Sequence, residues 1–196
     1  AFRGGLAYAG TTFTAGNGVY TFETTPAQTI GGTIIIQNLT VASGVNLTNN
    51  GSITVGTALS GAGTWTQGTG TRTLNIGGTS SITTLDASST GNTVNYSGGA
   101  QTVMAIPYHH LSLSNTGAKT LPVGLTIING NLTISGAAIT ATAADLTIGG
   151  NLTTSGAALT ANHALNVGGN WSGTFSAGTS TVTLQGALAQ TIALSP

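Results

Sequence analysis

Apolar and polar residues alternate along most of this chain, so the local period of hydrophobicity is two residues. The segments Leu132-Thr133-Ile134 and Leu146-Thr147-Ile148 are clear examples. Successive side chains of an extended strand point to opposite faces, so the alternation gathers the apolar residues on one face. The sequence therefore predicts short β-strands, separated by corners that are rich in glycine, asparagine and serine.

These strands belong to a longer repeat of about 20 residues. A Gly-Asn pair occurs at Gly130, again at Gly150 and again at Gly169, and similar apolar positions follow each pair. Self-similarity at this period is typical of solenoids, in which each coil buries its apolar face against its neighbours. We expect eight apolar residues to point inward and to be buried, namely Leu132, Ile139, Leu146, Ile148, Leu152, Leu159, Leu165 and Val167.

Two further repeats extend this pattern over the rest of the chain. An aromatic residue, followed by glycine three positions later, occurs at Phe13, Trp65 and Phe175. A tail of the form Ala-Gln-Thr-(Ile/Val) occurs at residues 27–30, 100–103 and 189–192. We therefore expect an all-β fold, a β-solenoid or β-helix-like repeat with about 20 residues per coil. Residues 11–196 would form a single solenoid domain, preceded by an N-terminal segment of residues 1–10.

The composition is unusually poor in charge. Charged residues make up 3% of the chain, and the formal net charge is zero; an average soluble domain has about 25%. Three scattered cations cannot neutralise a row of phosphates, so we expect no nucleic-acid partner. Near-zero net charge favours association, and few ionisable groups predict a stability that changes little with pH.

The chain contains no cysteine, so disulfides and thiolate chemistry are excluded. No apolar run is long enough to span a bilayer, and we expect no membrane span. No signal peptide is present, and Ala1 could be the mature end after cleavage of one.

The residues that could carry chemistry are few and scattered. Glu23, Asp86 and Asp145 are too far apart in the repeat to share one catalytic groove. His109 and His110 are adjacent, and neighbours on a strand point to opposite faces, so we expect no shared metal. We therefore expect no enzymatic activity, no metal and no cofactor.

Two surface features leave alternatives open. Thr-x-Thr pairs such as Thr64/Thr66 could order water as ice-binding solenoids do, but in the sequence they do not recur at one position of consecutive coils. Asparagines in Asn-x-Ser/Thr sequons could carry glycans or could stack in a ladder. The sequons are at Asn38, Asn46, Asn50, Asn95, Asn131, Asn151 and Asn170. The aromatic residues that could form a carbohydrate-stacking surface or belong to the core are Phe13, Trp65, Trp171 and Phe175.

The order of motifs between Val94 and Ile134 resembles that of a known group. Val-x-Tyr-x-Gly-x-x-Gln-Thr-Val (94–103) is followed by Tyr-x-x-Leu-x-Leu-Ser (108–114), Lys-Thr-Leu (119–121) and Gly-Asn-Leu-Thr-Ile (130–134). This order is similar to that of bacterial extracellular β-strand-repeat proteins, which form the β-solenoid stalks of surface adhesins and cell-surface filaments. The resemblance implies an extracellular or cell-surface location. Its motifs specify strands and turns rather than an activity.

We therefore expect a structural protein that assembles with itself, head to tail, into a filament or surface fibre. The strand that follows the first two Ala-Gln-Thr tails is missing after Ile192, and the N-terminal segment is a candidate donor of that strand. The candidate subunit contacts are Phe2, Leu6, Tyr8, Ile192 and Leu194. The alternative is a binding module, either a carbohydrate-binding adhesin segment or an ice-binding solenoid, with cell-surface or matrix glycans as candidate partners.

Overall fold

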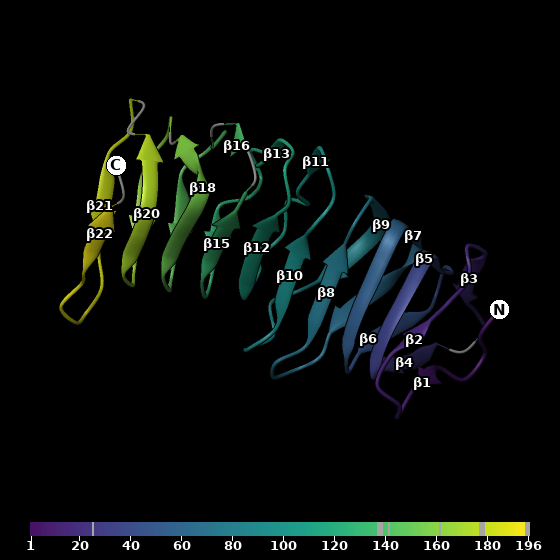
Figure 1. The fold of residues 1–196 in the computed structure, drawn as a ribbon. Coiled ribbons are helices and arrows are strands. Elements are labelled where there is room, and N and C mark those ends of the chain that lie inside the picture. Colours follow the sequence, from purple (N-terminus) through teal and green to yellow (C-terminus); the bar gives the residue numbers. More distant parts are fainter. Residues whose placement is uncertain (25, 137–138, 141, 161, 177–178, 195–196) are drawn as a thin grey trace. The chain divides into compact units, whose positions relative to one another are not determined.

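The fold of the chain is known from a computed structural model that describes residues 1–24, 26–136, 139–140, 142–160, 162–176 and 179–194 (Figure 1). Its regular secondary structure, within these residues, consists of β-strands and contains no helix. No helix of the described residues is therefore long and apolar enough to cross a membrane. Contacts between residues divide the chain into two compact units, Ala1–Ser97 and Gly98–Pro196.

The first unit is built from strands that stack in parallel. Its strands, within the described residues, are β1 (Leu6–Ala7), β2 (Phe13–Thr14), β3 (Val19–Phe22), β4 (Ala27–Gly31), β5 (Thr33–Val41), β6 (Asn46–Asn49), β7 (Ser52–Gln67), β8 (Thr73–Ile76), β9 (Thr79–Asp86) and β10 (Thr93–Tyr96). The long strand β7 follows the course of one coil: its successive segments pair with β5 and then with β6 on one side, and with β8 and then β9 on the other.

The core of the first unit consists of apolar columns that run across the stacked strands. One column contains Ile34, Ile53, Leu74 and Val94, each of which is the register partner of the next. All four side chains are completely buried. Each coil thus covers the apolar face of its neighbour, as the sequence period predicts.

A polar network interrupts this core at Asn49 and Gln67, which are also completely buried. The Asn49 amide donates to Gln67 Oε1 (2.7 Å) and to the Thr73 carbonyl (2.9 Å), and Trp65 Nε1 donates to Gln67 Oε1 (2.9 Å). Buried polar groups are tolerated when they are paired in this way. Because the partners come from neighbouring coils, the network also fixes their register.

The second unit repeats the architecture with shorter strands. Within the described residues its strands are β11 (Gln101–Thr102), β12 (His110–Ser114), β13 (Lys119–Thr120), β14 (Ile127–Ile128), β15 (Leu132–Ser135), β16 (Ile139–Thr140), β17 (Leu146–Ile148), β18 (Leu152–Thr160), β19 (Leu165–Val167), β20 (Trp171–Ser176), β21 (Val182–Leu184) and β22 (Ile192–Leu194). They form three parallel stacks, in the orders β12-β15-β18-β20-β22, β11-β13-β16 and β14-β17-β19-β21.

The register of the second unit confirms the predicted repeat. The register partner of Leu132 is Leu152, and the partner of Leu152 in the following coil is Trp171, so the residues that follow the three Gly-Asn pairs lie side by side. Seven of the eight residues expected inside are buried, namely Leu132, Leu146, Ile148, Leu152, Leu159, Leu165 and Val167. The eighth, Ile139, belongs to β16, but its side chain lies outside the described part of the structure.

Two of the four aromatic positions, Trp65 and Trp171, belong to the core. Trp65 is completely buried and Trp171 is 4% exposed, so neither forms a flat stacking platform on the surface. Phe13 is half-buried, and the side chain of Phe175 lies outside the described part. Parallel strands that stack at a period of about 20 residues make the chain an all-β, β-solenoid-like repeat protein.

Candidate functional site

Each acidic residue has its own local partner. Glu23 forms an exposed ion pair with Arg3 (3.5 Å). Asp86 accepts from the backbone and hydroxyl of Ser88, and Asp145 accepts from the backbone N–H of Ala164 (3.0 Å). Within the described residues, no three His, Cys, Asp or Glu side chains lie close enough together to hold a metal ion.

The two adjacent histidines lie closer together than strand alternation predicts. The rings of His109 and His110 meet edge to face, with centroids 4.2 Å apart. His110 begins β12, so the alternation of a regular strand does not extend to His109. His110 Nδ1 accepts the backbone N–H of Asn131 (2.9 Å), and Nδ1 can accept this bond only when it is unprotonated.

The scarcity of ionisable groups predicts a stability that changes little with pH, and His110 is the exception: we expect it to cause a small decrease in stability as the pH falls below neutrality. Burial and the neighbouring His109 lower the pKa of His110 below its usual 6.5. Between the lowered pKa and 6.5 the unfolded chain binds more protons, so stability rises with pH through this window and is reduced below it. Urea unfolding at a series of pH values would measure this dependence.

The variant His110→Gln should flatten this pH profile, because glutamine can accept the Asn131 N–H but does not titrate in this range. The exposed His163 provides a matched control, and His163→Gln should leave the slope in place. An equal slope in wild type and His110→Gln would contradict the assignment to His110.

Lys119 is a completely buried cation. Its ammonium group donates to the carbonyls of Gly98 and Gly99, both at 2.7 Å. Burial lowers the pKa of Lys119, since it penalises the charged form. The side chain fastens the corner at Gly98–Gly99 to the next coil, and we assign it a structural role.

Three candidate glycosylation sites form a hydrogen-bonded ladder along the second unit. The side-chain oxygen of Asn131 accepts the backbone N–H of Asn151 (2.9 Å), and that of Asn151 accepts the N–H of Asn170 (2.7 Å). Asn170 accepts in turn from Thr191 (2.9 Å), and His110 occupies the rung before Asn131. The ladder that we considered as the alternative to glycosylation is therefore present.

The other four sequons lie in the first unit. Asn50 is exposed, and its backbone N–H donates to the Ile30 carbonyl (2.7 Å). The side chains of the other three bond to neighbouring coils: Asn38 donates to the Asn17 carbonyl (3.2 Å), Asn46 accepts from Thr66 (2.8 Å) and Asn95 donates to Asn75 (3.0 Å). Glycosylation of any of the seven stays a prediction.

The glutamine of the Ala-Gln-Thr tail closes a corner in each of its three copies. Gln101 Oε1 accepts the backbone N–H of Gly98, and Gln190 Oε1 accepts that of Gly186, both at 2.8 Å. The side-chain amide of Gln28 donates to the Glu23 carbonyl (2.9 Å), and Gln28 Oε1 accepts the backbone N–H of Gly5 (3.1 Å). This repeated motif is therefore explained by backbone pairing.

Outward polar residues align in columns across the first unit. Thr48 is the register partner of Thr29 and of Thr66, and Thr66 is the partner of Asp86. The column contains single threonines only. The register partners of Thr64 and Thr66 are Asn46 and Thr48 on one side and Thr84 and Asp86 on the other, so this Thr-x-Thr pair does not recur in the neighbouring coils. The intervals between register partners differ slightly from coil to coil, so a constant spacing in the sequence misses the alignment.

The strongest candidate for a functional surface is the edge strand β22. It pairs with β20 in the register Trp171 to Ile192 and Gly173 to Leu194. Within the described residues, β22 is the last strand of its stack. Ile192 occupies the column of the buried residues Leu132, Leu152 and Trp171, yet Ile192 and Leu194 are each 51% exposed.

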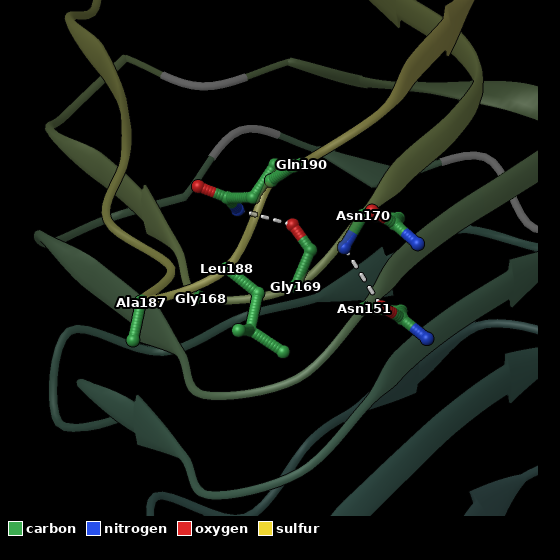
Figure 2. Close-up of a pocket in the computed structure, with 8 residues that line it drawn as sticks. Asn151, Gly168, Gly169, Asn170, Ala187, Leu188 and Gln190 are labelled. Atoms are coloured by element: carbon green, nitrogen blue, oxygen red, sulfur yellow. Dashed lines mark hydrogen bonds between the residues drawn. The ribbon is translucent and has the colours of Figure 1, made fainter.

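A shallow pocket adjoins this edge (Figure 2). Figure 2 shows Asn170 beside Asn151 and Gln190 turned toward Gly169, where its amide donates to the Gly169 carbonyl. Leu188 also lines the pocket and is 86% exposed. Leu188 was missed in the sequence, because it lies in a corner and has no equivalent at the repeated positions.

The candidate contacts of the N-terminal segment lie against their own chain. The Phe2 ring stacks on that of Phe22 (4.8 Å between centroids), and Tyr8 lies against Phe13 (5.7 Å). Leu6 belongs to β1, which pairs with β4 of the same chain. A donated N-terminal strand would have to leave these contacts first.

The fold defines the chain as a β-solenoid-like repeat protein. Within the described residues, its strand β22 presents half-exposed apolar side chains at an edge that pairs with no further strand. Comparison of the chain with protein-family models, with curated proteins and with solved structures finds no match.

Proposed function

We propose that this chain is a structural, extracellular protein that assembles with itself through the edge of β22. The observation that supports the proposal is the half-exposure of Ile192 and Leu194 at positions that are inward in the preceding coils. In the interior of a solenoid, each coil buries its inward apolar residues against the coils on both sides. A further coil on β22 would remove them from water in the same way.

The chemistry of the chain favours such an association. An edge strand presents unpaired backbone groups, and proteins usually protect it with charged side chains. This chain has six charged residues among 196, and none lies in β21, β22 or the segment between them. Contact between two different surfaces of identical subunits does not close on itself unless the rotation permits a ring, so it builds filaments. The resemblance to surface filaments and adhesin stalks supports the extracellular location.

We expect the double variant Ile192→Glu/Leu194→Glu to abolish self-association. Two carboxylates at the edge would repel a second copy and could not be buried without a large desolvation cost. Light scattering against concentration and negative-stain microscopy would measure the effect. Because both side chains are half-exposed already, circular dichroism should show that the variant stays folded.

Val123→Glu is the matched control, because Val123 is 67% exposed but lies in a corner of the same unit, between β13 and β14. It should associate like the wild type. A monomeric wild type at high concentration, or undiminished association of the double variant, would contradict the proposed function.

A second candidate function is binding to a regular polymer surface or to ice. The aligned column of Thr29, Thr48, Thr66 and Asp86 supports it, since neighbouring strands repeat at about 4.8 Å and present their outward groups at that spacing. Ice-growth measurements and co-sedimentation with insoluble polysaccharides would test this candidate independently of self-association.

A further inference from the structure

We infer that the strand that covers β22 is β1 of a second copy, which lies parallel to β22 with Leu6 beside Ile192 and stays paired with β4 of its own chain. This inference rests on the proposed function and names the two surfaces that meet. It differs from strand donation, in which the N-terminal segment leaves its own subunit.

The hydrogen bonds of β22 determine which of its backbone groups are available. The backbone N–H of Trp171 donates to the Thr191 carbonyl (3.0 Å), so the backbone groups of Thr191 and Ala193 point toward β20. Backbone groups alternate in direction along a strand. The N–H and carbonyl of Ile192 therefore point away from β20, toward the uncovered side.

The first strand of the chain has the complementary arrangement. The backbone N–H of Tyr8 donates to the Gly31 carbonyl (3.0 Å), and Leu6 is the register partner of Ile30. The backbone groups of Leu6 and Tyr8 therefore point toward β4, and the N–H of Ala7 and the carbonyl of Gly5 point away from it. Within the described residues, β1 is the first strand of its stack.

The two edges match when Leu6 lies beside Ile192. In this register the Ile192 N–H can donate to the Gly5 carbonyl, and the Ala7 N–H can donate to the Ile192 carbonyl, as in any parallel ladder. Leu6 would continue the inward column and cover Ile192. The small residues Ala7 and Ala193 would lie side by side on the outer face, where both are exposed.

The N-terminal segment contacts the other two strands at this end of the first unit. Phe2 bridges to the outer edge of β3: its N–H donates to the Thr21 carbonyl (2.6 Å), and its carbonyl accepts from the Glu23 N–H (3.0 Å). The Tyr8 ring lies against Phe13 of β2. Within the described residues β1 pairs with β4 alone, so its other edge carries no strand pairing.

The sequence around β1 fits the same place in the stack. Gly4-Gly5-Leu6-Ala7 has the order glycine, small or polar, apolar, small that is found in Gly169-Asn170-Trp171-Ser172. The second of these segments forms the start of β20, whose strand lies against the preceding coil through Leu152 and Trp171. The segment at the start of β1 therefore has the same residue pattern as a segment that packs against a preceding coil.

Disulfide trapping between two single-cysteine variants tests the register, because the natural chain has no cysteine. One variant carries Ala193→Cys and the other carries Ala7→Cys, and the two are mixed and oxidised. Register partners on neighbouring strands are about 5 Å apart, within the range that a disulfide spans. We expect a mixed disulfide dimer on non-reducing gels, in several-fold higher yield than with the matched partners Thr14→Cys on β2 or Thr21→Cys on β3.

A second variant distinguishes docking from strand exchange. Ala7 and Gly31 are register partners, so Ala7→Cys/Gly31→Cys should form a disulfide that fastens β1 to β4 within one chain. A Cβ added at Gly31 would meet Asn50 Cβ at 3.7 Å, an ordinary contact. We expect this fastened protein to assemble as well as the wild type. Loss of assembly on oxidation, with recovery on reduction, would establish strand exchange and overturn the inference.

The failure of this inference can be told apart from failure of the proposed function. If the wild type assembles but Ala193→Cys is trapped preferentially with Thr14→Cys or Thr21→Cys, the β1 register is wrong and self-assembly stands. If the wild type does not assemble and no pair is trapped, both proposals are overturned.

Discussion

Replacement of Leu152 by aspartate is expected to unfold the coils of the second unit. Leu152 is completely buried in β18, between Leu132 and Trp171 of the neighbouring strands. An unpaired carboxylate at this position would lose its hydration without gaining a partner, and we expect a loss of more than about 4 kcal/mol. Urea unfolding followed by far-ultraviolet circular dichroism would measure the loss.

Thr153→Asp is the matched control, because Thr153 is the next residue of the same strand and points outward. Its effect should stay within about 0.5 kcal/mol. Similar effects of the two substitutions would show that the inward and outward faces of β18 are assigned incorrectly.

Gly61→Ala is expected to destabilise the first unit by about 3 kcal/mol or more, since two costs add at this position. Gly61 has φ +116°, a conformation that residues with a side chain rarely adopt. A Cβ added there would also lie 2.0 Å from the Val41 carbonyl oxygen of the preceding coil. The stack would have to separate locally to admit the methyl group. Thermal and urea unfolding of the purified variant would measure the loss.

Substitutions at two other glycines separate the effect of the positive φ from the effect of the close contact with a neighbouring coil. Gly70 also has a positive φ (+81°), but a Cβ there meets nothing within 4 Å, so Gly70→Ala should cost about 1–2 kcal/mol. Gly18 has neither constraint, and Gly18→Ala should be neutral or slightly stabilising. Equal effects at Gly61 and Gly70 would mean that the close approach of neighbouring coils contributes nothing.

The ends of the two units differ in a way that matters for assembly. At the start of the first unit, Phe2 stacks on Phe22 and Tyr8 lies against Phe13, so aromatic rings cover part of the first coil. At the end of the second unit, Ile192, Leu194 and Leu188 stay largely exposed. A covered end next to an accessible strand β1 suits the docking of an intact coil better than the exchange of a strand.

The sequence by itself determined the type of element, the repeat and the inward face. The alternation around Leu132, Leu152 and Leu165 specifies strands with one apolar side, and all three residues are buried. This prediction succeeds because stacking of a coil on its neighbours is nearly a local, one-dimensional problem. The asparagine ladder could also be anticipated from the Gly-Asn pairs, since it links equivalent positions of successive coils.

Only the tertiary structure decided which residues of different coils lie side by side. The interval between register partners varies along the chain: it is shorter from Gln101 to Lys119 than from Leu111 to Leu132. The corners differ in length from coil to coil, so a constant sequence period does not reveal that Thr29, Thr48 and Thr66 lie side by side.

The burial of Lys119 and the position of the N-terminal segment were decided in the same way. Lys119 is buried because two backbone carbonyls of a neighbouring corner accept hydrogen bonds from its ammonium group. The residues next to Lys119 in the sequence do not indicate that these carbonyls lie there. Phe2 and Leu6 lie against strands of their own chain that begin well after them in the sequence. Contacts of this kind depend on how the corners are folded, and a repeat pattern carries no information about corners that do not repeat.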